Sequence, residues 1–293
     1  MAGLCDRVSR RLKAEHRHQR KRYPSSKGKY KTADANAWKQ AEATERRGKI
    51  LMQDFEKIYQ FQSIYKARRG KRGKEAVKKF ETNLLEAIQV ISFEIRTGRY
   101  TPSKYHSFII HEPKERLIET NSFKEKVIQH DICDNVLSLT LEPHFVIDNY
   151  ASQKNKGIFF ALDRLTEFLH KYYRKHGAQG YILKGDIHHY FASIEHEKLK
   201  AALEKFVEDP DVLRIVEKIV DSTPNPGVPI GNQTSQFFAL LALNGLDHLV
   251  KDQYGAKYYG RYMDDFYIIC ETKEEAKTYL EKIEKYLGVQ ELQ

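Results

Sequence analysis

The sequence predicts an α+β fold, with a helix-rich first part followed by a second part that alternates short strands, helices and a hairpin. Apolar residues recur every three or four positions through residues 75–95, which is the pattern of one buried helix face. From residue 105 onward, short apolar runs alternate with charged and turn residues, as in strands. Of the 293 residues 41% are hydrophobic and 31% charged, which supports a packed core and argues against a disordered chain.

The first half is expected to be helical over residues 34–99, with a β-hairpin after it. The hairpin strands are residues 108–110 and 116–118, two apolar bursts with charged residues between them. A strand over 181–186 leads into a further helix, and the prolines of residues 221–229 indicate a loop. A second hairpin is expected from the runs 257–263 and 266–270. The remaining expected helices cover the following ranges: 123–141, 162–173, 235–250 and 273–287.

The basic excess is concentrated at two places. The chain has 50 Lys and Arg against 40 Asp and Glu, a formal charge of +10. Between Arg7 and Lys31 there are eleven basic residues, including Arg20, Lys21 and Arg22, and a single acid. This arm either orders on a polyanion or is a solvated tail, and charge alone leaves both open. A second cluster in residues 66–74 lies in a glycine-containing loop suited to phosphate contact, with these candidates: Arg68, Arg69, Lys71 and Arg72.

Several classes of protein are excluded. The longest apolar stretch, residues 237–243, is too short to cross a bilayer, and the N-terminus lacks the apolar core of a signal sequence, so no membrane partner is expected. Cys5, Cys133 and Cys270 are far apart, without the spacing of a zinc site or a disulfide framework. This fits a reducing cytosol, and we expect a cytoplasmic protein.

Three aspartates are the candidates for chemistry. Asp186 follows a hydrophobic strand, and Asp264 and Asp265 lie at the tip of the expected second hairpin. Carboxylates within apolar sequence are costly unless they are paired or bound to metal. A turn can bring two adjacent aspartates near a strand-end aspartate, where their oxygens would hold two divalent ions for an in-line phosphoryl transfer. The alternative is structural, because aspartate is also common in turns and at helix N-caps.

The residues around these aspartates resemble the reverse transcriptase family. Tyr262-Met-Asp-Asp265 is the YMDD form of its signature, and Asp186-Ile-His-His-Tyr-Phe-Ala-Ser-Ile194 resembles its first aspartate motif. The resemblance implies an RNA-directed DNA polymerase with a right-hand fold of fingers and palm. It also implies that Asp186, Asp264 and Asp265 are catalytic, and that they bind two Mg²⁺ ions, with Mn²⁺ as an alternative. The carbonyl of Ile187 would share in this ligation, and Tyr262 and Met263 would contact the nucleic acid.

A third motif lies between the two aspartate motifs. It reads Val228-Pro-Ile-Gly-Asn-Gln-Thr-Ser-Gln236. Most reverse transcriptases have a glutamine where Ile230 stands and a proline where Gln236 stands. This departure resembles the error-prone enzymes of diversity-generating retroelements. The resemblance implies that Ile230, Gly231 and Gln236 contact the incoming nucleotide, and that the aliphatic Ile230 removes a polar constraint on it.

Further blocks extend the resemblance over most of the chain. Pro113-Lys-Glu-Arg-Leu-Ile118 resembles the basic fingers hairpin of the family, which makes Lys114 and Arg116 candidates for binding the triphosphate. Phe191, five residues after Asp186, fits the sugar gate that excludes a ribose hydroxyl. Three other blocks match: 98–102, 123–130 and 150–157. Without the aspartates, each of these blocks alone would be better explained as a charged surface helix or turn.

The resemblance also implies a domain plan and partners. We expect a basic arm (1–33), a helical extension (34–104), fingers (105–180) and palm (181–293). In the family a lysine-bearing strand and a helical thumb follow near residue 293, so we expect this chain to lack a thumb and to be weakly processive. The expected partners are template RNA, a primer strand, dNTPs and a small basic accessory protein, in a bacterial or phage-encoded system.

Two other functions stay open at this point. An antiphage defence reverse transcriptase would share the palm but make other DNA products, and only Ile230 and Gln236 distinguish it in this sequence. A non-catalytic RNA-binding scaffold would explain the missing thumb. It would not explain three buried carboxylates kept close to a polyanion, which they repel.

Overall fold

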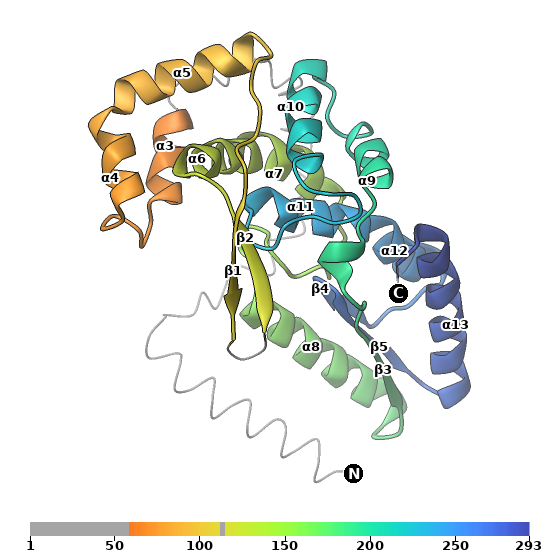
Figure 1. The fold of residues 1–293 in the computed structure, drawn as a ribbon. Helices are drawn as coiled ribbons and strands as arrows, with labels where there is room; N and C mark the ends of the chain where they lie inside the picture. Colours follow the sequence, from red (N-terminus) through yellow and green to blue (C-terminus); the bar gives the residue numbers. More distant parts are fainter. Residues whose placement is uncertain (1–58, 112–114, 293) are drawn as a thin grey trace.

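The computed structural model describes residues 59–111 and 115–292, which form a mixed helix and strand structure with two small antiparallel sheets (Figure 1). The expected basic arm and the start of the helical extension lie outside these residues. The strands have the following bounds: β1 His106–Ile110, β2 Arg116–Thr120, β3 Tyr181–Gly185, β4 Tyr259–Tyr262 and β5 Asp265–Cys270. The α-helices have the following bounds: α3 Tyr59–Ala67, α4 Glu75–Thr82, α5 Leu84–Arg96, α6 Phe123–Ile132, α7 Ser138–Leu141, α8 Ile158–His176, α9 His196–Leu203, α10 Pro210–Val220, α11 Gln233–Ala242, α12 Asn244–His248 and α13 Lys273–Gln290.

The helix expected over residues 75–95 is two helices. Asn83, with φ −109° and ψ 36°, leaves the helical conformation and separates α4 from α5. Asparagine competes with helical hydrogen bonding and favours such a break. The two helices bury different residues, Val77 on α4 against Ile91 and Ile95 on α5. The apolar stripe therefore predicts correctly that this segment has a buried side, but the prediction of one continuous helix is wrong.

The expected first hairpin is confirmed by strands β1 and β2, which pair with Phe108 opposite Ile118. The strand β1 is exposed along its whole length. Tyr105 holds the base of the hairpin, because its hydroxyl lies 2.9 Å from Ser222 Oγ and accepts a hydrogen bond from Asn232 Nδ2 at 2.6 Å. The hairpin is thereby joined to the loop that carries the third motif.

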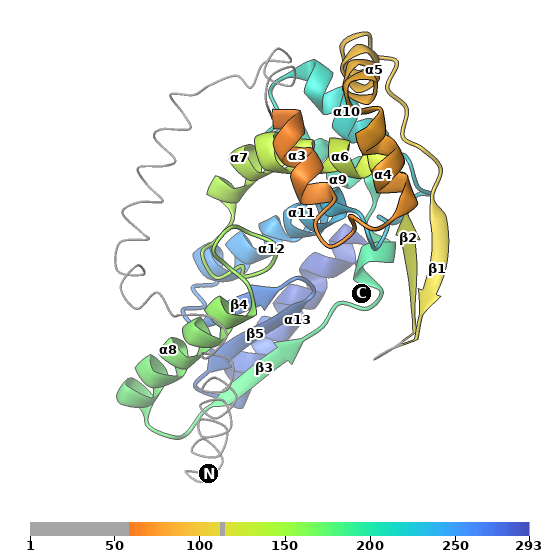
Figure 2. The same ribbon diagram turned by 90° about the vertical axis from the view of Figure 1, so that its left-hand side faces the viewer.

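The second sheet has the strand order β3-β5-β4 and lies between α8 and α13 (Figure 2). Alternate residues of β5 point to opposite faces. Phe266 and Ile268 join the main core together with Ile283 of α13, whereas Ile269 packs with Phe168 of α8. Both faces of the central strand are therefore covered, which fixes the position of the turn that connects β4 to β5.

The main core gathers around α11. The expected helix over 235–250 is interrupted at Leu243, which has φ −102° and ψ 5°, and it continues as α12. Helix α10, which the sequence analysis did not predict, buries Val212, Ile215 and Val216 in the same core. None of the described helices is both long and apolar enough to cross a bilayer.

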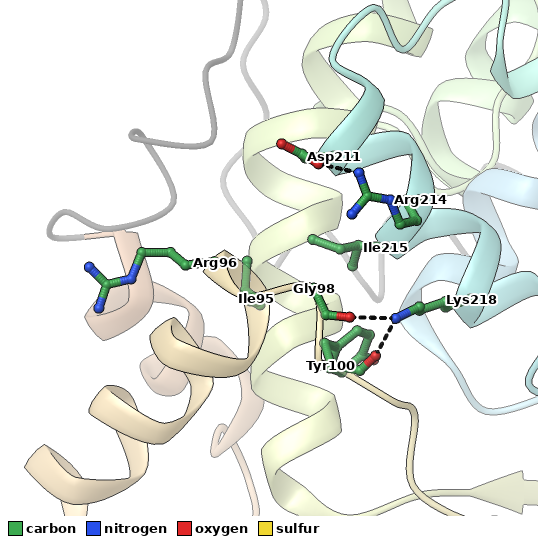
Figure 3. Close-up of a pocket in the computed structure, with 8 residues that line it drawn as sticks. All are labelled: Ile95, Arg96, Gly98, Tyr100, Asp211, Arg214, Ile215 and Lys218. Atoms are coloured by element: carbon green, nitrogen blue, oxygen red, sulfur yellow. Dashed lines mark hydrogen bonds and ion pairs between the residues drawn. The ribbon is translucent and has the colours of Figure 1, made fainter.

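The joint between α5 and α10 contains a small cavity (Figure 3). Lys218 Nζ donates to the carbonyl oxygens of Gly98 at 2.9 Å and Tyr100 at 2.8 Å, which ties the end of α5 to α10. The cavity volume is about 20 Å³. That is room for one water molecule, so this joint is structural and is not a substrate site.

Candidate active site

The register of the second sheet places the three aspartates at one end of it. Gly185 pairs with Phe266, and continuing this register would set Asp186 opposite Asp265. A Cβ atom on Gly185 would lie 2.2 Å from the Phe266 ring, so glycine is required directly before Asp186. The β3–β5 pairing thus brings the start of the first aspartate motif to the end of the Tyr262–Asp265 motif.

The turn between β4 and β5 consists of Met263 and Asp264, flanked by the pair Tyr262 and Asp265. Met263 has φ 57°, a left-handed conformation that allows the tight reversal. Asp264 is half-buried, whereas Asp186 and Asp265 are exposed. The expected hairpin is confirmed, and the expectation that all three carboxylates are buried is wrong.

Asp264 is the electrostatic centre of the site. Burial raises its pKa above the ordinary value, and the charges of Asp186 and Asp265 raise it further, while Arg116 opposes them. The charges of Asp186, Asp265 and Arg116 thus all act on the Asp264 carboxyl, in agreement with the β3–β5 register, which when continued sets Asp186 opposite Asp265. Three repelling carboxylates form a region of negative potential that favours a cation.

The side chains at this site suit a divalent metal ion in the type of their donor atoms and in their charge. Carboxylate oxygens are the donors that Mg²⁺ and Mn²⁺ prefer. Lys184 Nζ lies 3.2 Å from Asp265 Oδ1 and partly neutralises it. Within residues 59–111 and 115–292, no three side chains of His, Cys, Asp or Glu already form a group able to hold an ion. The donors are of the right type, but their side chains do not form a closed shell.

A fully buried ion pair supports the turn, and the sequence analysis did not identify it. Arg261 Nε and Nη2 donate to Asp247 Oδ1 at 2.7 Å and Oδ2 at 2.6 Å. The Nη1 of the same guanidinium donates to the Met263 carbonyl at 2.6 Å. Burial disfavours the charge of Arg261, but Asp247 more than offsets this effect and raises the pKa of the guanidinium. Two features of the sequence point to this ion pair, namely a charged residue within an apolar strand and another within an apolar helix.

Phe191 lies next to the third motif. It is partly buried against the main core, and its carbonyl accepts a hydrogen bond from the Val228 amide at 2.8 Å. Ile187, expected to offer a carbonyl ligand, has a buried side chain that anchors the segment after Asp186. The structure therefore brings the first and third motifs into direct contact.

The third motif also touches the hairpin of β1 and β2. The Glu119 amide of β2 donates to the Ile230 carbonyl at 3.0 Å. Gly231 has φ +136°, and a Cβ atom there would lie 2.4 Å from the Glu119 carbonyl oxygen. The side chain of Ile230 is 37% exposed. The loop thus holds its backbone against β2 and leaves an aliphatic side chain open to a ligand.

Gln236 contacts a different neighbour. Its Oε1 accepts a hydrogen bond from Ser152 Oγ at 3.0 Å. Ser152 belongs to the block 150–157, so this contact joins two segments that the sequence analysis treated separately. This contact is difficult to predict from the sequence, because serine and glutamine are ordinary surface residues.

The remaining candidates lie away from the aspartates or outside the described residues. Arg68 forms an ion pair with Glu81 and stacks on Tyr65, and its side chain is only 18% exposed. Three other cations of the loop between α3 and α4 are partly or fully exposed: Arg69, Lys71 and Arg72. Four candidates lie outside the described residues: Arg20, Lys21, Arg22 and Lys114.

Comparison with known proteins identifies one family. The family model described as reverse transcriptase (RNA-dependent DNA polymerase) matches residues 111–293. No curated protein matches the sequence. One similar solved structure is telomerase from Candida albicans in complex with a TWJ fragment of telomeric RNA, with 10% identity and a TM-score of 0.47, covering 68% of this chain and 44% of that one. Another is apo telomerase from Candida tropicalis truncated from its C-terminal domain, with 13% identity and a TM-score of 0.49, covering 66% of this chain and 48% of that one. The chain thus matches less than half the length of either telomerase.

Proposed function

The chain belongs to the reverse transcriptase (RNA-dependent DNA polymerase) family, and we propose that it copies an RNA template into DNA at the aspartate site. The observation that carries this proposal is the β3–β5 register, which places Asp186 beside the turn containing Asp264 and Asp265. Arg116 of β2, whose charge opposes the rise in the pKa of Asp264, adds a cation to the same site. Template RNA, a primer strand and dNTPs are the substrates of this proposal.

Asp186, Asp264 and Asp265, with the Ile187 carbonyl, would hold the divalent ions. When bound, Mg²⁺ or Mn²⁺ would supply charge stabilisation for phosphoryl transfer and activate the primer hydroxyl. Asp264 needs its carboxylate ionised for this role, and a nearby cation favours the ionised form. In the structure, Lys184 forms an ion pair with Asp265. This ion pair would have to break for the Asp265 carboxylate to serve as a metal ligand.

Residues around the aspartates would bind and select the nucleotide. Arg116, together with Lys114, would contact the triphosphate, because a guanidinium matches phosphate oxygens in bidentate geometry. Phe191 would press on the sugar and exclude a ribose hydroxyl. Ile230, Gly231 and Gln236 would line the base-pair side of the pocket. The contacts of Ile230 with β2 and of Val228 with Phe191 support this grouping.

The finer proposal is error-prone synthesis of the diversity-generating retroelement type, in which a small basic accessory protein assists the enzyme. It is supported by Ile230 and Gln236, which replace the polar and cyclic residues found in most of the family. The exposed aliphatic side chain of Ile230 offers no hydrogen bond with which to test the geometry of a base pair.

Primer extension tests both levels of this proposal. The full chain is given a primed RNA template rich in adenine, Mg²⁺ and dNTPs, and the products are sequenced. We expect extension with errors concentrated opposite adenine. Extension with an even error spectrum would contradict the retroelement assignment and favour an antiphage defence enzyme. If no extension occurs with either Mg²⁺ or Mn²⁺, even with an accessory protein present, the polymerase proposal is wrong.

A further inference from the structure

The loop between α3 and α4, residues 68–74, is a defined structure that presents cations to solvent; it is called the basic loop below. Its backbone is closed by hydrogen bonds from the Lys71 amide to the Arg68 carbonyl at 2.8 Å and from the Lys74 amide to the Lys71 carbonyl at 3.0 Å. Gly70, with φ +72°, provides the left-handed residue that this reversal requires. The lysines of this loop therefore occupy set positions.

Helix α6 presents a polar stripe toward α3 and the basic loop. Lys126, His130 and Asp134 follow one another at intervals of four, which places them on one side of the helix and its π-helical extension. Lys66 of α3 forms an ion pair with Asp134 at 2.7 Å, which fixes the register of α3 along this stripe. The chain continues from Lys66 into the basic loop, so the loop is held close to α6.

Three lysines that form no ion pair among the described residues, Lys71, Lys74 and Lys126, belong to the basic loop and to the stripe of α6 that it faces. Burial lowers the pKa of Lys126, and the charges of Lys71 and Lys74 lower it further, so both lie near it. Two nearby acids are engaged elsewhere, since Glu81 pairs with Arg68 and Asp134 pairs with Lys66, while Glu75, which follows Lys74, lines the hollow described below. Among the described residues, no ion pair involves any of the three lysines. A cluster of like charges that costs free energy in the free protein is stabilised by a bound anion.

An exposed aromatic ring contacts the first residue of the basic loop. Tyr65 of α3 is 59% exposed, and the Arg68 guanidinium lies 4.1 Å from its ring centroid. The cation covers one part of the ring while the ring itself stays accessible. Sites for single-stranded nucleic acid combine such rings, on which bases stack, with cations that follow the phosphates.

A hollow next to the loop extends the basic surface. It has a volume of about 440 Å³ and is lined by Gly73, Glu75, Lys78, Lys79 and Thr82. Its two lysines lie on α4, directly after the basic loop. Figure 1 shows α3 and α4 on the opposite side of the molecule from α13.

We propose that Lys71, Lys74 and Lys126 bind successive phosphates of a single-stranded RNA while one of its bases stacks on Tyr65. This inference rests on the proposed function, in which such a strand would be unpaired template outside the aspartate site. A single strand is chosen over a duplex because paired bases cannot offer a free face to Tyr65. Lys126 is the new element, since it lies on a helix far from the basic loop in the sequence and its charge was attributed to no site.

Fluorescence anisotropy tests the proposal directly. The full chain is titrated into a labelled, unstructured oligouridylate of about 12 nucleotides, without dNTPs or divalent ions, over a series of monovalent salt concentrations. The test variant is Lys71→Gln, Lys74→Gln, Lys126→Gln. The matched control is Lys273→Gln, Lys277→Gln, Lys285→Gln, which removes the same charge from exposed positions of α13. Circular dichroism verifies that each variant is folded.

The test variant is expected to lose at least about tenfold in affinity at low salt. The slope of log K against log salt should become shallower by about 2, because three phosphate contacts at about 0.7 each are removed. Tyr65→Ala is expected to weaken binding about tenfold with little change in slope, because it removes stacking and no charge. Lys126→Arg should retain most of the affinity.

Three results would overturn the proposal. The first is an unchanged affinity and salt slope in the test variant. The second is an equal loss of affinity in the α13 control. The third is that the test variant loses as much affinity for duplex RNA as for the single strand, because that would indicate general electrostatic attraction. Failure of the proposed function is separate from these outcomes. A wild-type chain that binds the oligouridylate through these lysines but extends no primer would contradict the polymerase and leave the RNA site intact.

Discussion

Arg261 and Asp247, both with no exposed surface, form a two-point ion pair at 2.6 and 2.7 Å beneath the turn that carries Asp264. The same guanidinium holds the Met263 carbonyl, and the Tyr259 hydroxyl donates to Asp247 Oδ1 at 2.5 Å. A buried charge left without its partner is strongly unfavourable, so this pair fixes one arrangement of strands and turn. The position of the catalytic candidate therefore depends on two residues that do not face the site.

Loss of either partner should be strongly destabilising. Arg261→Leu leaves Asp247 buried and unpaired, and we expect the free energy of unfolding to fall by about 3 to 5 kcal/mol. Chemical denaturation measures this. Arg214→Leu, at the exposed pair with Asp211, is the control and should change stability by less than about 1 kcal/mol. Equal effects of the two substitutions would show that the buried pair contributes no more to the free energy of unfolding than the exposed pair does.

Asp131 should make stability depend on pH. Burial raises its pKa from 3.8 to about 6, although Ser63 Oγ and Asn135 Nδ2 donate to its Oδ1 at 2.8 and 3.0 Å. Because the folded-state pKa is raised, the contribution of this group is fully present below about pH 4 and is lost as the pH rises through about 6. Asp131→Asn keeps an oxygen acceptor and removes the charge.

We therefore expect Asp131→Asn to raise the free energy of unfolding by about 1 to 3 kcal/mol at pH 7.5 and to have a much smaller effect at pH 4.5. Denaturant titrations of both proteins at the two pH values measure the difference. A stabilisation that is the same at both would mean that the charge of Asp131 is not its cause.

Gly231→Ala should separate the third motif from the β1–β2 hairpin. The added Cβ atom would lie 2.4 Å from the Glu119 carbonyl oxygen, so the loop or β2 has to move. We expect the KM for dNTP to rise about tenfold, since a shift of about 1 Å disturbs the pocket. Gly255→Ala is a matched control, with φ +69° and nothing within 4 Å of the new atom, and it should affect stability alone. A normal KM for Gly231→Ala would place the motif outside the nucleotide pocket.

Phe191→Ala should relax the choice of sugar. If the ring blocks the ribose hydroxyl, the ratio of kcat/KM for dNTP over rNTP should fall about tenfold or more, chiefly through improved use of rNTP. Phe191→Tyr retains the ring and should keep the ratio. If the alanine variant loses both substrates equally, Phe191 acts only in packing against the main core.

Much of the fold could be predicted from the sequence, because periodic burial depends on local pattern. The hairpins around residues 110 and 264 and the helices expected over 123–141 and 273–287 lie where spacing placed them, and the helix expected over 162–173 is present but longer, as α8. The interruptions at Asn83 and Leu243 were missed, since the apolar stripe continues through both breaks and periodicity alone does not reveal them, although asparagine itself favours a break. Helix α10 was missed next to a proline-rich loop.

The candidate site, too, could be predicted only in part from the sequence. Asp186, Asp264 and Asp265 are recognisable because motif and local structure coincide, and the register of β3 with β5 supports their grouping. Arg261 and Asp247 were not identified, because a charged residue in an apolar segment does not reveal its partner across the fold. The joining of Ile230 to β2 depends on a backbone contact, which no side-chain pattern encodes.

The central claim is that Asp264 acts in nucleotidyl transfer, and single-nucleotide primer extension by Asp264→Asn tests it most directly. The substitution removes a half-buried carboxylate whose pKa is raised, so the variant should melt at or above the temperature of the wild type. The account predicts that extension falls at least about a thousandfold, which corresponds to about 4 kcal/mol of lost transition-state stabilisation. Asp163→Asn, at an exposed position on α8, should extend as the wild type does. A folded Asp264→Asn variant that extends within about tenfold of the wild type would contradict the account.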